Sequence, residues 1–542
     1  MTTRRRARRV LPAMLAALAL TLGLPQAAGA AAQPRMEGKP LKATHKIHLS
    51  RPKLVNPTGH AEPKVHKSQG PLPTIPRKKL AELKAEAAKK PGVRKPEQSG
   101  KNSAKKLAPP PSQGSFEGLS QPCCVRPPDT HGAVSRGYFV EVTNGAGVGV
   151  YNKSDGSLLK NVSLASFFGY TAQEIFDPRV VYDKKWNRWV ISAEAFQEDQ
   201  DVQKVFYAVS TSSNPLGSWY IYTFDPPEEP GTGDFYDFPQ LGYDQDAVIV
   251  TANIFRPGEL GFNYIGSRAF GMAKADLYNG RFTDFRYFDV GLTGTVAPPI
   301  VEDDNANAFL VAAYPGADHL TLLKATGLGR SNGTIVQQPD VPVTNYFVPP
   351  NARQPGTDNV LDTLDARFQN ASTQIGNQLL NIHTVSGGDY PLPKWYQINT
   401  DTSTVPSGQF GFVFEGGSSE DFNPSVAGSA VGGTAENPIG RMFFTWTSTD
   451  AFGAPHQARV KSGGRLATDP VNVAGGNTHA EASTFYDPSP DTVERWGDYS
   501  SVTINPSATS TCPVGNRAYV VNERQINTTD WGSRIGRLGF CG

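Results

Sequence analysis

Three features of the 542-residue sequence predict an all-β fold and exclude a helical bundle. Gly and Pro are frequent, at 54 and 44 residues, and imply many turns. Phe, Tyr and Trp, at 28, 19 and 7 residues, favour strands over helices. A motif also recurs along most of the chain. Beyond the N-terminus no apolar run reaches the roughly 18 residues needed to span a bilayer, so we expect no transmembrane segment in the mature chain.

The first 30 residues have the pattern of a secretory signal peptide. Five arginines from Arg4 to Arg9 precede the apolar stretch VLPAMLAALALTLGL, and small residues ending in AAGA follow it. An uncleaved membrane anchor is the alternative, although the apolar run is short for a bilayer span. We therefore expect a secreted or extracellular protein.

Residues 31–113 form a basic arm and residues 114–542 an acidic body. The arm has 19 Lys or Arg against 5 Asp or Glu, whereas the body has 28 against 45. The arm is rich in Lys and Pro and lacks a sustained apolar period, which predicts disorder apart from a short helix around residues 77–90. A propeptide or flexible spacer is the plainest interpretation. Attachment to an anionic cell-surface polymer and docking on the acidic body are the alternatives.

Only four cysteines are present, and all lie beyond the arm. Export makes disulfides feasible, and the even count fits. Cys512 and Cys541 flank a two-strand pattern near the C-terminus, and we expect them to pair. The adjacent Cys123 and Cys124 are poorly placed to bond each other, so their partners stay open.

The recurring motif has an Asp or Asn near a Pro, a short apolar strand, a polar turn and a second apolar strand. Its clearest copy, FDPRVVYDKKWNRWVISAEAF, begins at Phe176. The intervals leave room for four short strands per unit, which is the blade of a β-propeller. We expect seven blades over residues 114–542, with six or eight as alternatives, and a final segment that closes the ring with the strand near residues 137–143. The seven markers are Asp129, Asp177, Asp237, Pro298, Asp365, Asn423 and Asp498.

The segments PPDTHGAV, FDPRVVYDKKWNRWVIS, DFPQLGYDQDAVIVTANIF and RWGDYSSVTINPS occur in this order. They resemble a family of secreted bacterial β-propeller proteins without an established shared activity, over roughly residues 116–542. The sequence departs from that family at Ser135 and Arg136, where members carry Gly-Pro, and in an insertion near residues 508–516. The turn SNPLGSW, which ends at Trp219, is similar to turns of sialidase and glycosidase propellers, where it has a structural role at the rim. The resemblance implies an architecture and leaves the chemistry open.

Repeat-equivalent residues should converge at one mouth of the central channel, because the innermost strands of all blades begin there. Crowded carboxylates have pKa values that are pushed apart, which suits an acid and base pair for glycoside cleavage, and they equally suit Ca²⁺. The alternative is that each aspartate accepts backbone N–H groups and fixes a turn. The expected ring comprises Asp129, Asp177, Asp237, Asp365 and Asp498, with Arg179 and Arg367 two places after their aspartates.

Within this ring we assign Asp177, Asp237 and Asp365 to the acid, base and pKa-setting roles of a catalytic site. Asp129, Arg179, Arg367 and Asp498 would contact the ligand. His479 and Glu481, on a Gly-rich loop, are a second candidate site. Glu481 would be the general acid and His479 would orient it. No zinc-ligand spacing and no nucleophile elbow is present in the sequence.

These observations predict a protein that binds glycan or another extracellular ligand at an acidic channel mouth. The alternatives are a glycoside-hydrolase-like enzyme with paired carboxylates and a structural component attached to the cell surface through the basic arm, so whether the protein is an enzyme stays open. The acidic body repels polyanions, which favours a neutral glycan or an extracellular protein as partner over nucleic acid. Ca²⁺ is the cofactor that the carboxylates suggest.

Overall fold

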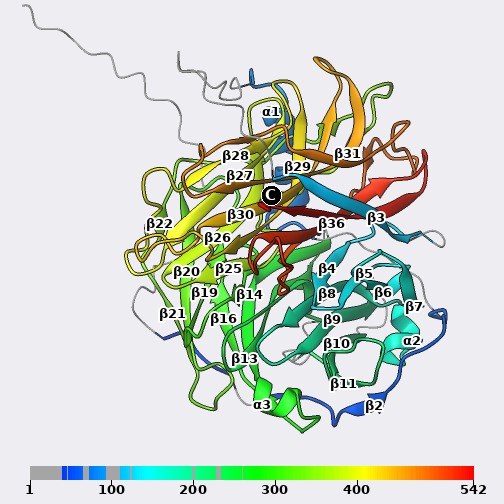
Figure 1. Cartoon of the computed structure of the whole chain (residues 1–542), viewed down its shortest axis with the longest axis vertical. Coiled ribbons are helices and arrows are strands. Elements are labelled where there is room, and N and C mark those ends of the chain that lie inside the picture. Colours follow the sequence, from blue (N-terminus) through cyan, green and yellow to red (C-terminus); the bar gives the residue numbers. More distant parts are fainter. Residues whose placement is uncertain are drawn as a thin grey trace, which may run out of the picture. The chain divides into compact units, whose positions relative to one another are not determined.

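Antiparallel β-sheets make up most of the described chain (Figure 1). The signal-peptide pattern and the cysteines Cys123 and Cys124 lie outside the described residues. No helix of the described part is long and apolar enough to cross a membrane. The computed structural model describes residues 40–44, 47–64, 72–92, 110–121, 125–197, 202–226, 233–258 and 261–541.

Seven sets of four antiparallel strands follow one another through the described residues. The first set is β4 (His131–Val134), β5 (Tyr138–Thr143), β6 (Gly147–Asn152) and β7 (Leu158–Val162). The second is β8 (Phe176–Asp183), β9 (Arg188–Gln197), β10 (Val202–Ser210) and β11 (Trp219–Phe224). The third is β12 (Phe235–Tyr243), β13 (Ala247–Gly258), β14 (Gly261–Ala273) and β16 (Tyr287–Gly291). The fourth is β17 (Val296–Ala297), β19 (Asn307–Ala312), β20 (His319–Thr326) and β21 (Thr334–Gln337).

The remaining sets complete the series, and short strands and helices lie between them. The fifth set is β25 (Ser372–Ile375), β26 (Gln378–Ser386), β27 (Pro391–Asn399) and β28 (Phe410–Phe414). The sixth is β29 (Glu420–Ser429), β30 (Arg441–Asp450), β31 (His456–Leu466) and β33 (Asn477–Glu481). The seventh is β35 (Ser501–Ile504), β36 (Arg517–Gln525), β37 (Trp531–Gly539) and β3 (Ser112–Ser120). The others are α2 (Leu164–Phe168), α3 (Lys274–Leu277), β15 (Asp284–Phe285), β18 (Pro299–Val301), β22 (Val341–Pro342), β23 (Ala352–Arg353), β24 (Val360–Leu361), β32 (Val473–Ala474) and β34 (Val493–Glu494).

The first strands of the sets lie round one channel. β4 contacts β8, β8 contacts β12, β25 contacts β29, β29 contacts β35, and β35 contacts β4. In the fourth set the strand is interrupted at Pro298. The following strand, β18, pairs in parallel with both β12 and β25. Residues from all of these strands line one cavity of about 80 Å³. This arrangement confirms the predicted all-β propeller class, and the exact blade count stays a prediction.

The hydrophobic core lies between successive sets. Each neighbouring pair of sets shares a buried apolar cluster, and the seventh set shares one with the first. Large aromatic side chains fill these layers: Trp219 of the SNPLGSW turn is fully buried between the first two sets, and its indole N–H donates to the Pro215 carbonyl at 3.1 Å. Aromatic residues at strand positions thus act as spacers between sheets.

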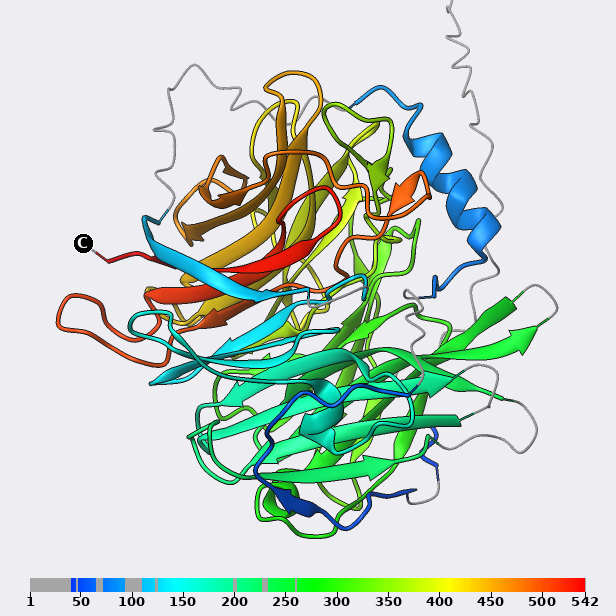
Figure 2. The same ribbon diagram turned by 90° about the vertical axis from the view of Figure 1, so that its right-hand side faces the viewer.

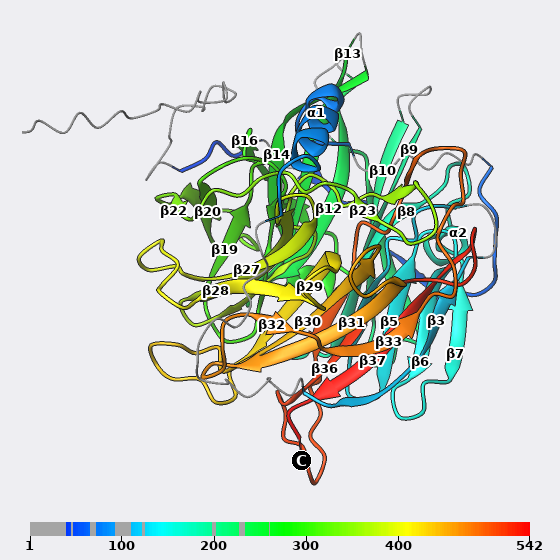
Figure 3. The ribbon, with the colours of Figure 1, turned by 90° about the horizontal axis from the view of Figure 1, so that it is seen from above.

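The ring closes through an earlier segment than the sequence suggested. β37 pairs with β36 and with β3, and Figure 3 shows β3 beside β37. The expected partner at residues 137–143 is instead β5, the second strand of the first set. Cys512 and Cys541 form the predicted disulfide and are 29 positions apart in sequence. The closing strand therefore begins at the end of the basic arm and continues into the first residues of the body.

Parts of the basic arm are ordered on the body, in contrast with the expected disorder. β1 (Ile47–His48) pairs with β15, and β2 (Lys53–Val55) pairs with β11 at the edge of the second set. The helix expected at residues 77–90 is present as α1 (Arg77–Ala87), which Figure 2 shows beside the body. The arm needs no core of its own, because open sheet edges pair its backbone and the body buries single side chains such as Leu41, Leu49 and Leu72.

Closure of the ring can be tested at the contact between the first and seventh sets. Phe139 of β5 is fully buried there and stacks on Tyr519 of β36, with ring centroids 5.8 Å apart. We expect Phe139→Ala to lower the free energy of unfolding by about 3–5 kcal/mol, because it leaves a cavity between the two sheets. Urea unfolding followed by tryptophan fluorescence measures this change. Leu158→Ala, at a position that is 50% exposed in the same set, is the control, and a loss below about 1 kcal/mol at Phe139 would show that the two sheets do not pack.

Candidate functional site

Three of the first strands, β8, β12 and β29, begin with a bulge in their pairing with the second strand. Their pairing with the second strand shifts register between Phe176 and Arg179 in β8 and between Asp237 and Gln240 in β12. A bulge with one residue in the left-handed region bends a strand and redirects its side chains. Residues with positive φ at the bulges are Asp177 (52°), Phe238 (56°) and Asn423 (48°), and Asp129 (47°) and Ala366 (72°) have positive φ ahead of β4 and β25. Asp237 and Asp365 therefore lie one residue before the true repeat position.

Three buried carboxylates meet at this end of the channel. Asp177 on β8, Glu194 on β9 and Asp237 on β12 each place a carboxylate oxygen within 4.8 Å of the others. Asp129 and Asp498 adjoin them: the Asp498 N–H donates to Asp129 Oδ1 at 2.8 Å, and Asn144 Nδ2 donates to Asp129 Oδ2 at 2.6 Å. The structure thus brings together four of the five predicted aspartates and adds Glu194.

Burial sets the acidity of these groups. Burial raises the pKa of Asp237 to about 7, and the nearby Asp177 carboxylate adds to the rise. The pKa of Glu194 is well above its usual range because of burial and then because of Asp177 and Asp237. Burial also raises the pKa of Asp129, Asp177 and Asp498, the last to about 7. Groups of this kind hold protons near neutral pH or need a cation beside them.

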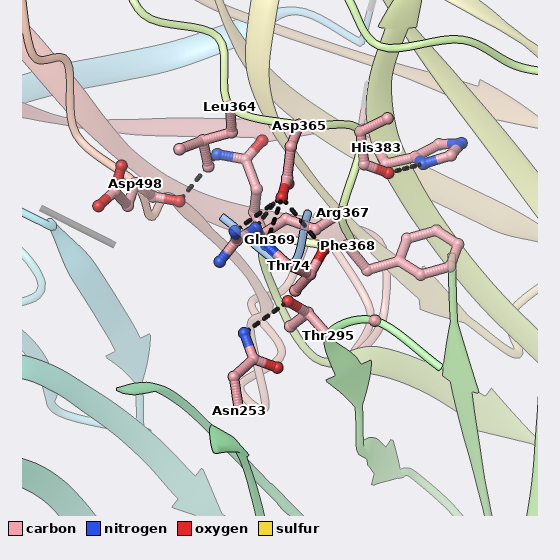
Figure 4. Close-up of polar contacts among 12 residues, drawn as sticks. Thr74, Asn253, Thr295, Leu364, Asp365, Arg367, Phe368, Gln369, His383 and Asp498 are labelled. Atoms are coloured by element: carbon pink, nitrogen blue, oxygen red, sulfur yellow. Dashed lines mark hydrogen bonds and ion pairs between the residues drawn. The ribbon is translucent and has the colours of Figure 1, made fainter. Parts of the chain in front are cut away.

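Asp365 is separate from the three carboxylates and is paired with Arg367. Arg367 donates through Nε to Asp365 Oδ1 at 2.7 Å and through Nη2 to Asp365 Oδ2 at 2.8 Å (Figure 4). Burial alone would raise the pKa of Asp365, but the Arg367 guanidinium outweighs it and lowers the pKa. In this pairing Asp365 is an ionised acceptor that fixes the direction of Arg367.

Arg179 joins several first strands from inside the channel. Its Nε donates to the Pro239 carbonyl at 3.0 Å, Nη1 to Asn370 Oδ1 at 2.9 Å and Nη2 to the Gln369 carbonyl at 3.0 Å. The guanidinium also lies 3.2 Å from the ring centroid of Tyr499. All three guanidinium nitrogens of Arg179 thus bind the chain itself.

His479 and Glu481 lie on β33, the outermost strand of the sixth set, and do not join the residues at the channel. His479 is buried with Nε2 2.7 Å from Ser462 Oγ, and burial lowers its pKa to about 4. Glu481 is exposed and pairs with Arg459 at 3.0 Å. This pair therefore has partners of its own at the edge of a sheet.

Glu194 is the site residue that the sequence reasoning did not assign. Glu194 lies in β9, the second strand of its set. It is paired with Phe176, the neighbour of Asp177 in sequence. An acidic residue in the apolar stretch ISAEAF of a buried strand was the signal that could have identified it.

The arm lies on the same mouth. The Leu72 N–H donates to Asp237 Oδ2 at 2.9 Å, and the Leu72 carbonyl accepts from Arg367 Nη2 at 2.9 Å. Thr74 donates to Asp365 Oδ2 through both its N–H and its hydroxyl, each at 3.3 Å. Three of the predicted site residues thus bind the backbone of this chain's own arm.

Helix α1 extends this contact over a groove. Lys84 pairs with Asp362 at 3.2 Å and donates to Asn351 Oδ1 at 2.7 Å and Thr363 Oγ1 at 3.0 Å. A cavity of about 680 Å³ lies between α1 and the body, lined by residues that include Leu80, Asp362, Asp365, Arg367 and Arg495. The described arm therefore covers the mouth without filling it.

Comparisons with known proteins leave the family open. No protein-family model and no curated protein matches the sequence, so the resemblance to secreted bacterial propeller proteins stays a prediction. Among solved structures, the chain is similar to an exo-β-1,3-galactanase from Phanerochaete chrysosporium with galactose, at 11% identity over 79% of this chain and 99% of that chain, with a TM-score of 0.32. A lignostilbene dioxygenase from Pseudomonas brassicacearum matches at 11% identity over 66% and 73%, with a TM-score of 0.35. An α-L-arabinofuranosidase from Lactobacillus brevis matches at 10% identity over 52% and 86%, with a TM-score of 0.24. At these scores the similarities carry no argument about activity.

The role of Arg179 can be tested by substitution. We expect Arg179→Leu to lower the free energy of unfolding by about 3–5 kcal/mol, because three acceptors lose their donor inside the protein. Arg179→Lys should still cost about 2 kcal/mol, because one ammonium cannot reproduce the planar fork. Urea unfolding measures both changes, with the exposed Arg281→Lys as the control. Unchanged stability of Arg179→Lys would contradict a structural role for the three donors.

Proposed function

We propose that this protein binds an extracellular polypeptide segment at the acidic mouth of its channel, and that its own residues 72–76 occupy this site in the full-length chain. The observation that supports the proposal is a set of three backbone hydrogen bonds: Asp237 accepts from the Leu72 N–H, Asp365 accepts from the Thr74 N–H, and Arg367 donates to the Leu72 carbonyl. Two carboxylates accept N–H groups and one guanidinium donates to a carbonyl, which is a suitable arrangement for an extended main chain. Secretion, predicted from the N-terminal pattern, would place this site outside the cell.

Two further features suit a peptide ligand. Arg367 is held in place by Asp365, so little freedom is lost when it meets a carbonyl. The side chain of Leu72 packs against Phe235 and Phe255 in a small aromatic cluster. The site therefore combines main-chain recognition with one apolar pocket for a side chain of about the size of leucine.

A glycoside-hydrolase-like activity is the second candidate, and one observation favours it. The carboxylate oxygens of Asp177, Glu194 and Asp237 lie within 4.8 Å of one another, near the separation of about 5 Å found between the carboxyl groups of retaining glycosidases. Asp177 and Asp237 are only 6% and 5% exposed with the arm in place. A sugar would therefore reach them only after residues 72–92 leave the mouth.

Removal of the arm segment tests the proposed binding. We expect a variant that lacks residues 72–92 to bind a labelled synthetic peptide of residues 70–90 saturably, because the mouth is then free, whereas the full-length chain should not bind it. Adding Arg367→Met to the deletion variant should lower its affinity for the peptide by about 10-fold or more, since the Leu72 carbonyl loses its donor. Fluorescence anisotropy measures both.

Arg330→Met, at an exposed arginine paired with Asp246, is the matched control and should leave the affinity unchanged. Equal peptide binding by the deletion variant and the full-length chain would contradict occupancy of the mouth by the arm. Binding of the deletion variant to neutral glycans alone would contradict a peptide ligand, and turnover of such glycans would favour the second candidate.

Docking of the arm should also depend on pH through Asp362. Burial alone would raise the pKa of Asp362, but Lys84 and Arg495 outweigh it and hold the pKa below its usual range. A depressed pKa in the docked state means that the stabilisation is complete above the ordinary pKa of about 4 and is lost as the pH falls further. We expect hydrogen-exchange protection of α1, corrected for intrinsic rates, to decrease between about pH 5 and pH 3. Asp362→Asn should show low protection at both values, and a wild-type α1 that is equally protected at both would contradict this role.

A further inference from the structure

The three carboxylates at the mouth lie in a geometry that a single metal ion could bridge. Asp177, Glu194 and Asp237 come from three strands, β8, β9 and β12, and the side chains are 6%, 0% and 5% exposed. Each provides a carboxylate oxygen, and these oxygens lie within 4.8 Å of one another. Three negative charges at this separation inside a protein repel one another strongly unless a positive charge lies between them.

The hydrogen bonding of Glu194 is a second, independent indication of an ion at this place. Its Oε2 accepts a hydrogen bond from Gln203 Nε2 at 3.2 Å. Its Oε1 is buried and has no hydrogen-bond partner within the described part of the chain. A buried acceptor without a donor is costly, and carboxylate oxygens in this state are commonly satisfied by a bound ion.

Neighbouring groups hold one oxygen of each carboxylate and so orient the side chain. Gln203 holds Glu194 and is itself fixed to the backbone of Tyr236, to which it donates at 2.7 Å and from which it accepts at 2.8 Å. The Tyr499 hydroxyl donates to Asp177 Oδ2, and the Leu72 N–H donates to Asp237 Oδ2 at 2.9 Å. Hydrogen bonds of this kind to the outer side of a ligand are typical of metal sites.

We infer that Asp177, Glu194 and Asp237 bind one Ca²⁺ ion at the acidic end of the channel. Ca²⁺ takes oxygen ligands at 2.3–2.6 Å, so one ion can contact oxygens up to about 5 Å apart. Mg²⁺ binds at about 2.1 Å and reaches oxygens only up to about 4.2 Å apart, in a stricter octahedron. The donor set contains no nitrogen or sulfur, which disfavours Zn²⁺. The inference of an ion site holds whether the mouth binds a peptide or a glycan.

The test uses the full-length protein and Ca²⁺ itself. After removal of metal with a chelator, we expect calorimetric titration with Ca²⁺ to show one site per chain, and the melting temperature to rise with Ca²⁺ more than with Mg²⁺. Glu194→Gln keeps the shape of the side chain and removes its charge. We expect this substitution to lower the affinity for Ca²⁺ at least 10-fold. Glu141→Gln is the matched control, since Glu141 is equally buried but accepts from Leu119, Tyr151 and Ser533.

Each outcome decides the inference. Loss of Ca²⁺ binding in Glu194→Gln with retention in Glu141→Gln supports the site. Absence of saturable Ca²⁺ binding by the wild-type chain, or equal affinity in wild-type and Glu194→Gln, overturns it. If Glu194→Gln does not fold, Asp237→Asn replaces it under the same criteria, and metal analysis of the wild-type protein purified in Ca²⁺ must give about one equivalent.

Discussion

The channel confines charged groups that have little access to water, and the rest of the mouth follows from how these groups satisfy one another. First strands from successive sets begin at the same end, so their polar side chains meet whether or not the charges balance. Arg179 balances part of the acidity by joining three sets and stacking on Tyr499. Arg367 and Arg495 pair with Asp365 and Asp498. Within the described chain, Glu194 is left without an ion pair, whereas Arg179 acts on the neighbouring Asp177 and Arg367 acts on Asp237.

The basic arm supplies positive charge and hydrogen-bond donors from outside the propeller. Its backbone N–H groups reach Asp237 and Asp365, and Lys84 reaches Asp362. Elsewhere the arm adds short strands to open edges, as β2 does on β11. A segment with too few apolar residues for a core of its own becomes ordered in this way, because the body provides both the edges and the buried surface. Opposite charges of the arm and the body meet directly in the ion pair of Lys84 with Asp362.

The repeat could be recognised in the sequence because each strand start requires a particular backbone conformation. Asp or Asn tolerates the left-handed conformation at the bulge, which is why Asp129, Asp177 and Asn423 marked the strand starts correctly. The same reasoning misplaced Asp237 and Asp365 by one position, since Phe238 and Ala366 adopt the left-handed conformation there and tertiary packing holds them in it. The repeat did not point to Glu194, because this residue lies on a second strand, outside the repeat marker, and only its place in an apolar stretch could have identified it. The order in the arm could not be predicted either, because it comes from edges and pockets that exist only once the sheets have formed.

Asp237 connects the two uses of the mouth. Its Oδ2 accepts the Leu72 N–H of the arm, and its carboxylate also faces Asp177 and Glu194. Any peptide that replaces residues 72–76 has to meet this same oxygen, and any ion held by the three carboxylates shares the residue with that peptide. An ion would favour the ionised form of Asp237, which is the better acceptor for a backbone N–H, so the two ligands would strengthen each other. Coupling between two sites is reciprocal, and the arm would then hold the ion as much as the ion holds the arm.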